Sequence, residues 1–162
     1  MNTADIFARA TTSGDDAHAT TIGNHAHAST SGAFAHAHTA GNHARATTTG
    51  NHARATTSGN HAHATTSGDY ARATTSGVLA HAATTGDFAR ATTSGENSIA
   101  AAFGANSAAR AANGGFIVLA QYNPDGDTVV AIKTAQAGRD GIKPDTWYKL
   151  SPTGEFVEAE VE

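Results

Sequence analysis

The chain has 162 residues, a formal net charge of −4 and no cysteine. This length fits one domain, or one short repeat array with a cap. The lack of cysteine excludes disulfides and thiolate metal sites, and the small net charge excludes the strongly basic surface typical of nucleic-acid-binding proteins. The N-terminal sequence has no basic start followed by an apolar run, and no stretch reaches the roughly 20 apolar residues that span a bilayer. We therefore expect neither a signal peptide nor a transmembrane segment.

A nine-residue repeat fills residues 1–113. Glycine recurs at eleven successive positions spaced by nine, from Gly14 to Gly104. Counted from the residue three after each glycine, the unit reads Ala-(Arg/His)-Ala-Thr-Thr-Ser-Gly-(Asn/Asp)-(His/aromatic). The first, third, fifth and seventh positions hardly change, whereas the others vary. This alternation with a period of two predicts β-strands whose constant side chains face inward.

The inward set of Ala, Ala and Thr is small enough to fit only a narrow interior between short strands of one coil. We expect glycine to supply a positive φ at each corner and the inner Thr hydroxyl to bond to a backbone group or to the Thr of the next coil. Stacked units pair their backbones with the coils above and below. The sequence thus predicts an all-β parallel β-solenoid with two nine-residue units per coil. A triangular coil of three units is the alternative, although it would leave more interior than Ala and Thr can fill.

The composition changes after residue 113. Residues 116–123 and 128–135 have the pattern of two strands joined by the turn NPDGDT, and DTWYKL and EFVEAEV flank a second turn. We predict that residues 114–162 form a small antiparallel β cap or attachment domain, because the last coil of a solenoid otherwise exposes an unpaired edge.

Charge divides unevenly between the two parts. The array has six Arg and six acidic residues, so it is neutral while its histidines are uncharged, whereas residues 114–162 have four basic and eight acidic residues. All ten histidines lie between His18 and His81. The array therefore becomes cationic as the pH falls through about 6.5.

The unit GNHAHATTSG resembles the head repeats of trimeric autotransporter adhesins and the solenoid arrays of bacteriophage tail fibres and small prophage proteins. The sequence GGFIVLAQYNPDGDTVVAIKTAQAGRDGIKPDTWYKL is similar to the closing segment of such phage-encoded repeat proteins. The array is unlike the calcium-binding repeats of bacterial toxins, because G-G-x-G-x-D never occurs. The resemblance implies a viral binding or structural protein, a homo-oligomer in the virion or the host cytoplasm, whose partner is a protein or a host surface glycan.

The variable second position of the repeat supplies the main candidate binding surface. A ladder of Arg and His side chains could hold an anionic sugar, a phosphate or a nucleic-acid backbone. We do not expect nucleic acid, because the array has no net charge and few aromatic residues to stack on bases. The ladder comprises Arg9, His18, His27, His36, Arg45, Arg54, His63, Arg72, His81 and Arg90.

Three H-x-H pairs are candidate metal ligands. Two histidines two apart on a strand face the same way, and such pairs from three chains around a fibre axis can hold an octahedral ion. The alternative is that these histidines are solvated outer residues, because the ninth position lies at a turn and splits the pair. The pairs are His25 with His27, His36 with His38, and His61 with His63. We expect no other cofactor.

No catalytic constellation is visible in the sequence. There is no serine or cysteine nucleophile in an elbow motif and no phosphate-binding loop, and the acids of the C-terminal part fall in turns, where Asp is favoured for backbone reasons. We therefore expect a protein that is not an enzyme. Two alternatives to a virion protein stay open: a cytoplasmic inhibitor of a bacterial defence system, similar to anti-CRISPR proteins, and an ice-binding solenoid that uses outer pairs such as Thr47/Thr49 and Thr56/Ser58.

Overall fold

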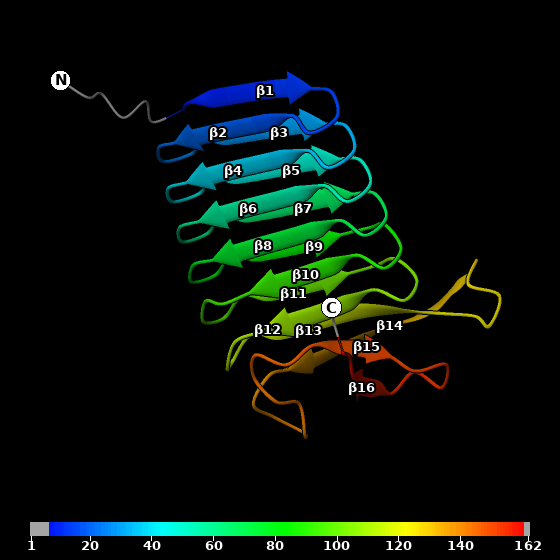
Figure 1. Ribbon diagram of the computed structural model, residues 1–162. Helices are drawn as coiled ribbons and strands as arrows, with labels where there is room; N and C mark the ends of the chain where they lie inside the picture. The colour runs from blue at the N-terminus through cyan, green and yellow to red at the C-terminus, as the bar shows by residue number, and fades with distance from the viewer. Residues whose placement is uncertain (1–6, 161–162) are drawn as a thin grey trace.

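The chain winds into an all-β parallel β-solenoid that ends in a small antiparallel region (Figure 1). The computed structural model describes residues 7–160, so the first six residues of the predicted array lie outside the described part. Twelve strands, β1 to β12, form the array, and each strand from β1 to β11 pairs in parallel with the strand two further along the chain. Two strands therefore complete one coil, which confirms the prediction of two units per coil.

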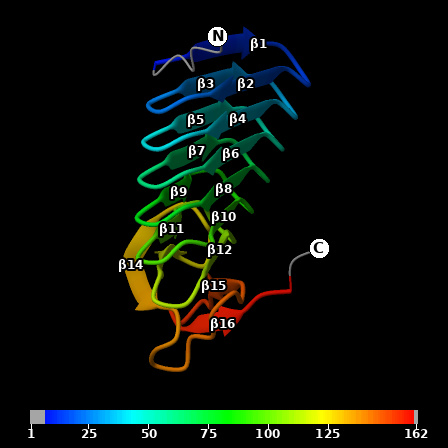
Figure 2. The ribbon, with the colours of Figure 1, turned by 90° about the vertical axis from the view of Figure 1, so that its left-hand side faces the viewer.

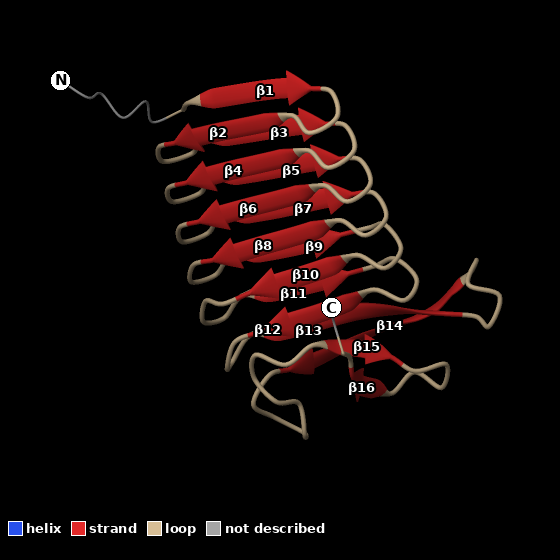
Figure 3. Ribbon diagram, in the orientation of Figure 1, coloured by secondary structure: helices blue, strands red, loops and turns tan. Residues whose placement is uncertain are grey.

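The strands form two eight-stranded sheets, here called sheet 1 and sheet 2 (Figure 3). Sheet 1 contains, in spatial order, β1 (Arg9–Ser13), β3 (His27–Ser31), β5 (Arg45–Thr49), β7 (His63–Ser67), β9 (His81–Thr84), β11 (Ile99–Ala102), β13 (Phe116–Tyr122) and β14 (Val129–Gln136). Sheet 2 contains β16 (Phe156–Glu158), β15 (Tyr148–Leu150), β12 (Ala108–Ala111), β10 (Arg90–Thr93), β8 (Arg72–Ser76), β6 (Arg54–Ser58), β4 (His36–Ala40) and β2 (His18–Ile22).

The two sheets face each other across an interior of Ala and Thr. Figure 2 shows the odd-numbered strands β3 to β11 in one layer and the even-numbered strands β2 to β10 in the other. Ala55 and Ala64, at the third position of the repeat, have no exposed surface, and Thr66 at the fifth position is also fully buried. Arg54 at the second position is exposed. These burials confirm the predicted inner and outer faces.

The inner Thr hydroxyls do not bond as predicted. Within residues 7–160, buried Oγ1 atoms without a hydrogen-bond partner belong to Thr12, Thr21, Thr30, Thr39, Thr48, Thr57, Thr66, Thr75, Thr84 and Thr93. The backbone groups of each strand are already paired with the neighbouring coils. Equivalent threonines lie one strand spacing apart, about 4.8 Å, which exceeds the reach of a hydrogen bond at about 3 Å. The threonines therefore contribute through packing of their methyl groups.

The left-handed corner of every turn is the ninth residue of the repeat, which the sequence did not predict. These residues have φ between 53° and 60° and include His25, Phe34 and Leu79. The predicted positive φ of the glycine holds from Gly14 to Gly68, where φ lies between 121° and 151°. It does not hold from Gly77 to Gly104, whose φ lies outside the left-handed region.

Close stacking of the turns explains the later glycines. A Cβ placed on Gly77 would collide with the carbonyl group of Gly59 in the preceding coil. The eighth position reinforces this stacking, because the side-chain oxygen of Asn42 accepts a hydrogen bond from the backbone N–H of Asn60, in the next coil, at 3.0 Å. Glycine is therefore required by contact between coils even where its φ is ordinary.

The C-terminal region extends both sheets and ends in antiparallel strands, as predicted. Strand β13 pairs in parallel with β11 and then antiparallel with β14. Strand β15 pairs antiparallel with β12 and with β16. Ile117 and Leu119 replace Ala and Thr inside the last coil and are the largest fully buried side chains. On the opposite sheet, Tyr148 of β15 is buried and pairs with Ala109 of β12.

Substitutions on the two faces of a strand should differ in cost. Ala55→Leu or Ala64→Leu forces extra methylenes into the close-packed interior and should lower the free energy of unfolding by about 1–3 kcal/mol or more. Arg54→Ser and His63→Ser change the outer face and should stay within about 0.5 kcal/mol. Chemical denaturation of the four variants checks this, and the reverse order would mean that the faces are assigned wrongly.

At Gly77, the effect of contact between coils can be measured without the effect of a strained backbone. Because Gly77 lies outside the left-handed region, Gly77→Ala tests the contact with Gly59 alone. We expect this variant to lose at least about 2 kcal/mol of unfolding free energy. Ser76→Ala, the same new residue one position earlier on the exposed outer face, is the control and should be nearly neutral. Equal losses at the two positions would contradict the role given to coil contact.

Candidate functional site

The structure divides the predicted Arg/His ladder into two columns on opposite faces. Sheet 1 carries Arg9, His27, Arg45, His63 and His81, and sheet 2 carries His18, His36, Arg54, Arg72 and Arg90. Within each column, side chains from successive strands lie side by side in register. The ten residues therefore form two separate candidate surfaces rather than one.

The two columns differ in how they place positive charge. On sheet 1, His27 separates Arg9 from Arg45. On sheet 2, three arginines follow one another on adjacent strands, and Arg72 pairs with Arg54 on one side and Arg90 on the other. We call these three the arginine column. Like charges on directly neighbouring strands are unfavourable, and burial together with the charge of Arg72 lowers the pKa of Arg90.

The three predicted histidine pairs do not share one geometry. His36 and His38 both lie on the outer face of β4. His25 and His61 lie in turns with a left-handed backbone, whereas their partners begin strands, so a corner splits these pairs. Within residues 7–160, no three His, Asp or Glu side chains form a cluster able to hold a metal ion. A metal held between several chains stays a prediction.

The turns carry ring stacks that sequence reasoning missed. On the edge where sheet-1 strands lead into sheet 2, Phe34, His52, Tyr70 and Phe88 stack in sequence; we call them the aromatic ladder. Their ring centroids are 4.9, 5.1 and 5.1 Å apart, with interplanar angles of 10°, 7° and 7°. The recurrence of aromatic residues in every second repeat, always at the ninth position, was the available signal.

A second stack lies on the opposite edge. The rings of His25, His43 and His61 are stacked with centroids 4.9 Å apart. The ninth position of the repeat therefore forms two separate rows, one on each edge of the array. One row contains the aromatic ladder, and the other contains three stacked histidines followed by Leu79 and Asn97.

The aromatic ladder and the arginine column border the same groove. Its lining residues are Phe34, His52, Arg54, Tyr70, Arg72, Phe88 and Arg90, and its volume is about 350 Å³. A second hollow shares Tyr70, Phe88 and Arg90 with it and continues to Lys149 and Glu160 near the C-terminus. A hollow strip therefore runs along one edge of the array from Phe34 to the antiparallel region.

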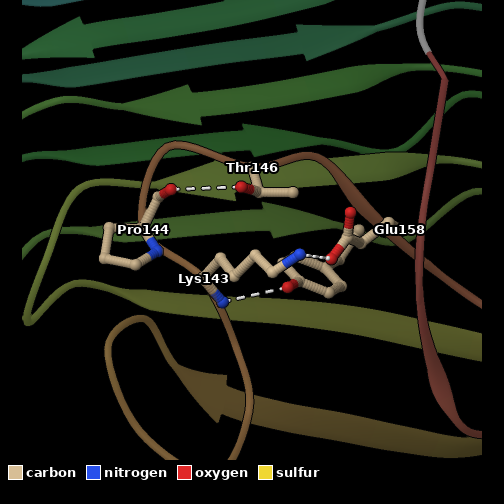
Figure 4. A network of polar contacts seen from close by, with 5 residues as sticks. Lys143, Pro144, Thr146 and Glu158 are labelled. Atoms are coloured by element: carbon tan, nitrogen blue, oxygen red, sulfur yellow. Dashed lines mark hydrogen bonds and ion pairs between the residues drawn. The ribbon is translucent and has the colours of Figure 1, made fainter.

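The polar groups of the C-terminal region bond to one another (Figure 4). Lys143 Nζ and Glu158 Oε1 form an ion pair at 2.7 Å, which raises the pKa of Lys143 through a hydrogen bond to Glu158. The backbone N–H of Lys143 donates to Tyr148 Oη at 2.9 Å, and Thr146 Oγ1 donates to the carbonyl oxygen of Pro144 at 3.1 Å. These contacts hold the loop against the sheet. Lys143 and Glu158 therefore have a structural role in the C-terminal region.

The turn between β13 and β14 gives a local explanation for one of its acids. Hydrogen bonds from Thr128 and then Asn123 lower the pKa of Asp127. Thr128 Oγ1 and Asn123 Nδ2 both donate to Asp127 Oδ1, at 2.9 Å each. Asp127 therefore bonds to side chains of its own turn, while the backbone N–H groups of Asp127 and Thr128 donate to Asn123 Oδ1.

The outer threonine pairs considered for ice binding lie on different sheets. Thr47 and Thr49 belong to β5 in sheet 1, and Thr56 and Ser58 belong to β6 in sheet 2. Each pair follows an arginine on the same outer face. Ice binding stays a prediction.

Comparison of the chain with protein-family models, curated proteins and solved structures gave no match. In the described part of the chain, no helix is long and apolar enough to cross a membrane. The assignment of the candidate site therefore depends only on the positions of its side chains.

The histidines of the two columns should make stability depend on pH. Burial, followed by neighbouring positive charge, lowers the pKa values of His27, His36 and His63. The folded chain then binds these protons more weakly than the unfolded chain, whose histidine pKa is about 6.5. Stability should be complete above a pH of about 6.5 and should fall as the pH drops below it. We expect a lower melting temperature at pH 5.5 than at pH 7.5.

A triple variant tests the origin of this dependence. Replacing His27, His36 and His63 with Asn removes the groups whose pKa is lowered, so the difference in melting temperature between pH 7.5 and 5.5 should shrink. His52→Asn, in a turn rather than in a column, is the control. A protein that melts at a higher temperature at pH 5.5 would contradict the sign of the effect.

Proposed function

We propose that this chain is a phage-encoded, non-enzymatic binding or structural protein whose solenoid is a rigid recognition surface for a host component. The observation that supports this proposal most strongly is the register of two repeat units per coil, which places side chains of one kind in straight columns on two faces. Such a surface suits an extended or repetitive partner, because each coil can repeat the contact made by the coil before it. A host surface glycan or a fibrous protein has this character.

The distribution of polar groups also favours binding over catalysis. Catalytic groups work in a concave, water-excluding site where several titratable side chains converge. Here the titratable groups with shifted pKa values do not converge on one point: His36 and Arg90 lie on β4 and β10, at two places along one column of sheet 2, and Lys143 lies in the C-terminal loop. The interior of the array is filled by Ala and Thr and offers no room for a substrate.

The C-terminal region supports a role in attachment. Strand β14 is the last strand of sheet 1 and exposes Val129, Val130 and Ile132, which are 48, 56 and 58% exposed. Apolar side chains grouped on an edge strand are typical of interaction surfaces. We propose that this hairpin joins the solenoid to a second copy or to another virion protein.

The acidic C-terminal region favours a second candidate function. Its eight acidic and four basic residues give it a net charge of −4. An acidic surface can occupy a site built for phosphates, as an inhibitor of a nucleic-acid-dependent defence system would need to do. In this hypothesis the chain acts in the host cytoplasm and resembles anti-CRISPR proteins in function.

Mass spectrometry of purified virions, beside lysate of infected cells, separates the two functions. A virion protein should be recovered in the virion fraction in constant ratio to the capsid protein. The cytoplasmic inhibitor should be recovered only from the lysate, and should protect the phage in a plaque assay on a host with an active defence system. Absence from virions would overturn the first proposal.

A further inference from the structure

We propose that the groove between the aromatic ladder and the arginine column binds an acidic polysaccharide that lies along the solenoid axis. This inference rests on the proposed function, since it names the ligand class and the place of contact for recognition of a host glycan. It commits to one of the two edges of the array and to one of the two Arg/His columns.

The placement of arginine is the first reason. Sheet 1 interrupts its column with His27, whereas sheet 2 places Arg54, Arg72 and Arg90 on adjacent strands. Neighbouring positive charges repel one another, and a negatively charged ligand relieves that repulsion. Planar guanidinium groups bind carboxylates through paired hydrogen bonds. A row of them one strand spacing apart, about 4.8 Å, fits a polymer that repeats its carboxylates along the axis.

The exposed part of the aromatic wall is the second reason. Tyr70 is 50% and Phe88 46% exposed, yet their rings are nearly parallel and 5.1 Å apart, so each covers the face of the next. The wall therefore presents ring edges, which carry the positive part of the aromatic quadrupole. Both walls of the groove favour negative oxygen atoms. The hydroxyl of Tyr70 and the imidazole of His52 add hydrogen-bonding groups suited to sugar hydroxyls.

The same geometry disfavours single-stranded nucleic acid. Proteins that bind it without sequence preference offer open aromatic faces on which bases stack. In the aromatic ladder, His52 and Tyr70 have neighbours on both faces. A base would have to separate two coils whose backbones are hydrogen-bonded to each other. A sugar acid needs no such opening.

No carboxylate is among the described residues that line the groove between Phe34 and Phe88. Asp69 and Asp87 precede Tyr70 and Phe88, but their Oδ1 atoms accept backbone N–H bonds from the next turn, from Asp87 at 3.0 Å and from Ala105 at 2.8 Å. Glu160 and Lys149 line the second hollow, at the C-terminal end of the strip. Between Phe34 and Phe88, the charged side chains that line the groove are the three arginines.

The test is affinity gel electrophoresis of the full chain in gels that contain polygalacturonate, hyaluronate or polysialate. Methyl-esterified polygalacturonate, which lacks the charge, and single-stranded oligothymidylate are the comparison ligands. The test variant is Arg54→Gln/Arg72→Gln. The matched control is Arg9→Gln/Arg45→Gln, which removes the same charge from sheet 1.

We expect at least one of the three acidic polysaccharides to retard the wild-type chain and the esterified polymer not to. Losing two charge-assisted contacts should weaken this binding by at least about tenfold in the Arg54/Arg72 variant. The Arg9/Arg45 control should change it less than about twofold. Equal loss in both variants, binding to none of the three polymers, or tighter binding to oligothymidylate would each overturn the proposal.

These results are distinguishable from failure of the proposed function. A virion protein that binds no acidic polysaccharide contradicts the groove alone. A chain that binds one through Arg54 and Arg72 yet is absent from virions contradicts the virion assignment alone. Circular dichroism of both double variants shows whether each keeps the wild-type fold.

Discussion

The structure depends on one constraint, the contact of each residue with the equivalent residue two repeat units away. Backbone hydrogen bonds join every coil to the next. In the turns the main chain approaches so closely that a Cβ at Gly59, Gly77 or Gly95 would collide with the equivalent glycine of the preceding coil. From β1 to β12 the coils therefore repeat one backbone path, and each residue pairs with the residue two repeat units further along the chain. The repeat ends at the last coil, where Phe116 of β13 pairs with Ile99 of β11 and the coil is one residue shorter.

The narrow interior follows from the same constraint. Ala side chains bury little apolar area, so the hydrophobic contribution per residue is small compared with that of a core of Leu or Ile. Closely spaced backbone ladders, stacked turn rings and side-chain amide contacts such as that between Asn42 and Asn60 make up for it. The larger Ile117 and Leu119 occur only where the last coil closes. The outer positions are thus left free to vary, and the candidate function lies there.

Much of this fold could be predicted from the sequence, because the positions that stay constant from repeat to repeat indicate which side chains face the interior. Constant Ala and Thr at alternate positions predicted the burial of Ala55 and Thr66, and the end of the repeat predicted the antiparallel strands. The left-handed ninth residue could not be predicted in the same way, since Phe34 and Leu79 rarely adopt that backbone and do so here because the stacked turns impose it. The unpartnered Thr hydroxyls also depend on exact spacing between coils.

The candidate site was only half predicted. The Arg/His ladder could be found from its repeat position, and its division between two sheets follows from the predicted coil of two units, although the sequence analysis treats the ten residues as one surface. The alternation of units between the two sheets stacks Tyr70 on His52. It also places Arg72 next to Arg54 and leaves Arg45 on the opposite sheet. The groove between the aromatic ladder and the arginine column, and the stack of His25, His43 and His61, both depend on the three-dimensional arrangement of the coils.

The most direct test of this account is disulfide cross-linking, which is clean because the chain has no cysteine. Thr47 and Thr65 are in-register neighbours on β5 and β7, one strand spacing apart and within the Cα separation of about 4.4–6.8 Å that a disulfide allows. The double variant Thr47→Cys/Thr65→Cys should cross-link readily on mild oxidation. Thr47→Cys/Thr74→Cys, whose cysteines are three repeat units apart, places them on opposite sheets and should stay reduced. Cross-linking of the second variant in preference to the first would contradict a coil of two units.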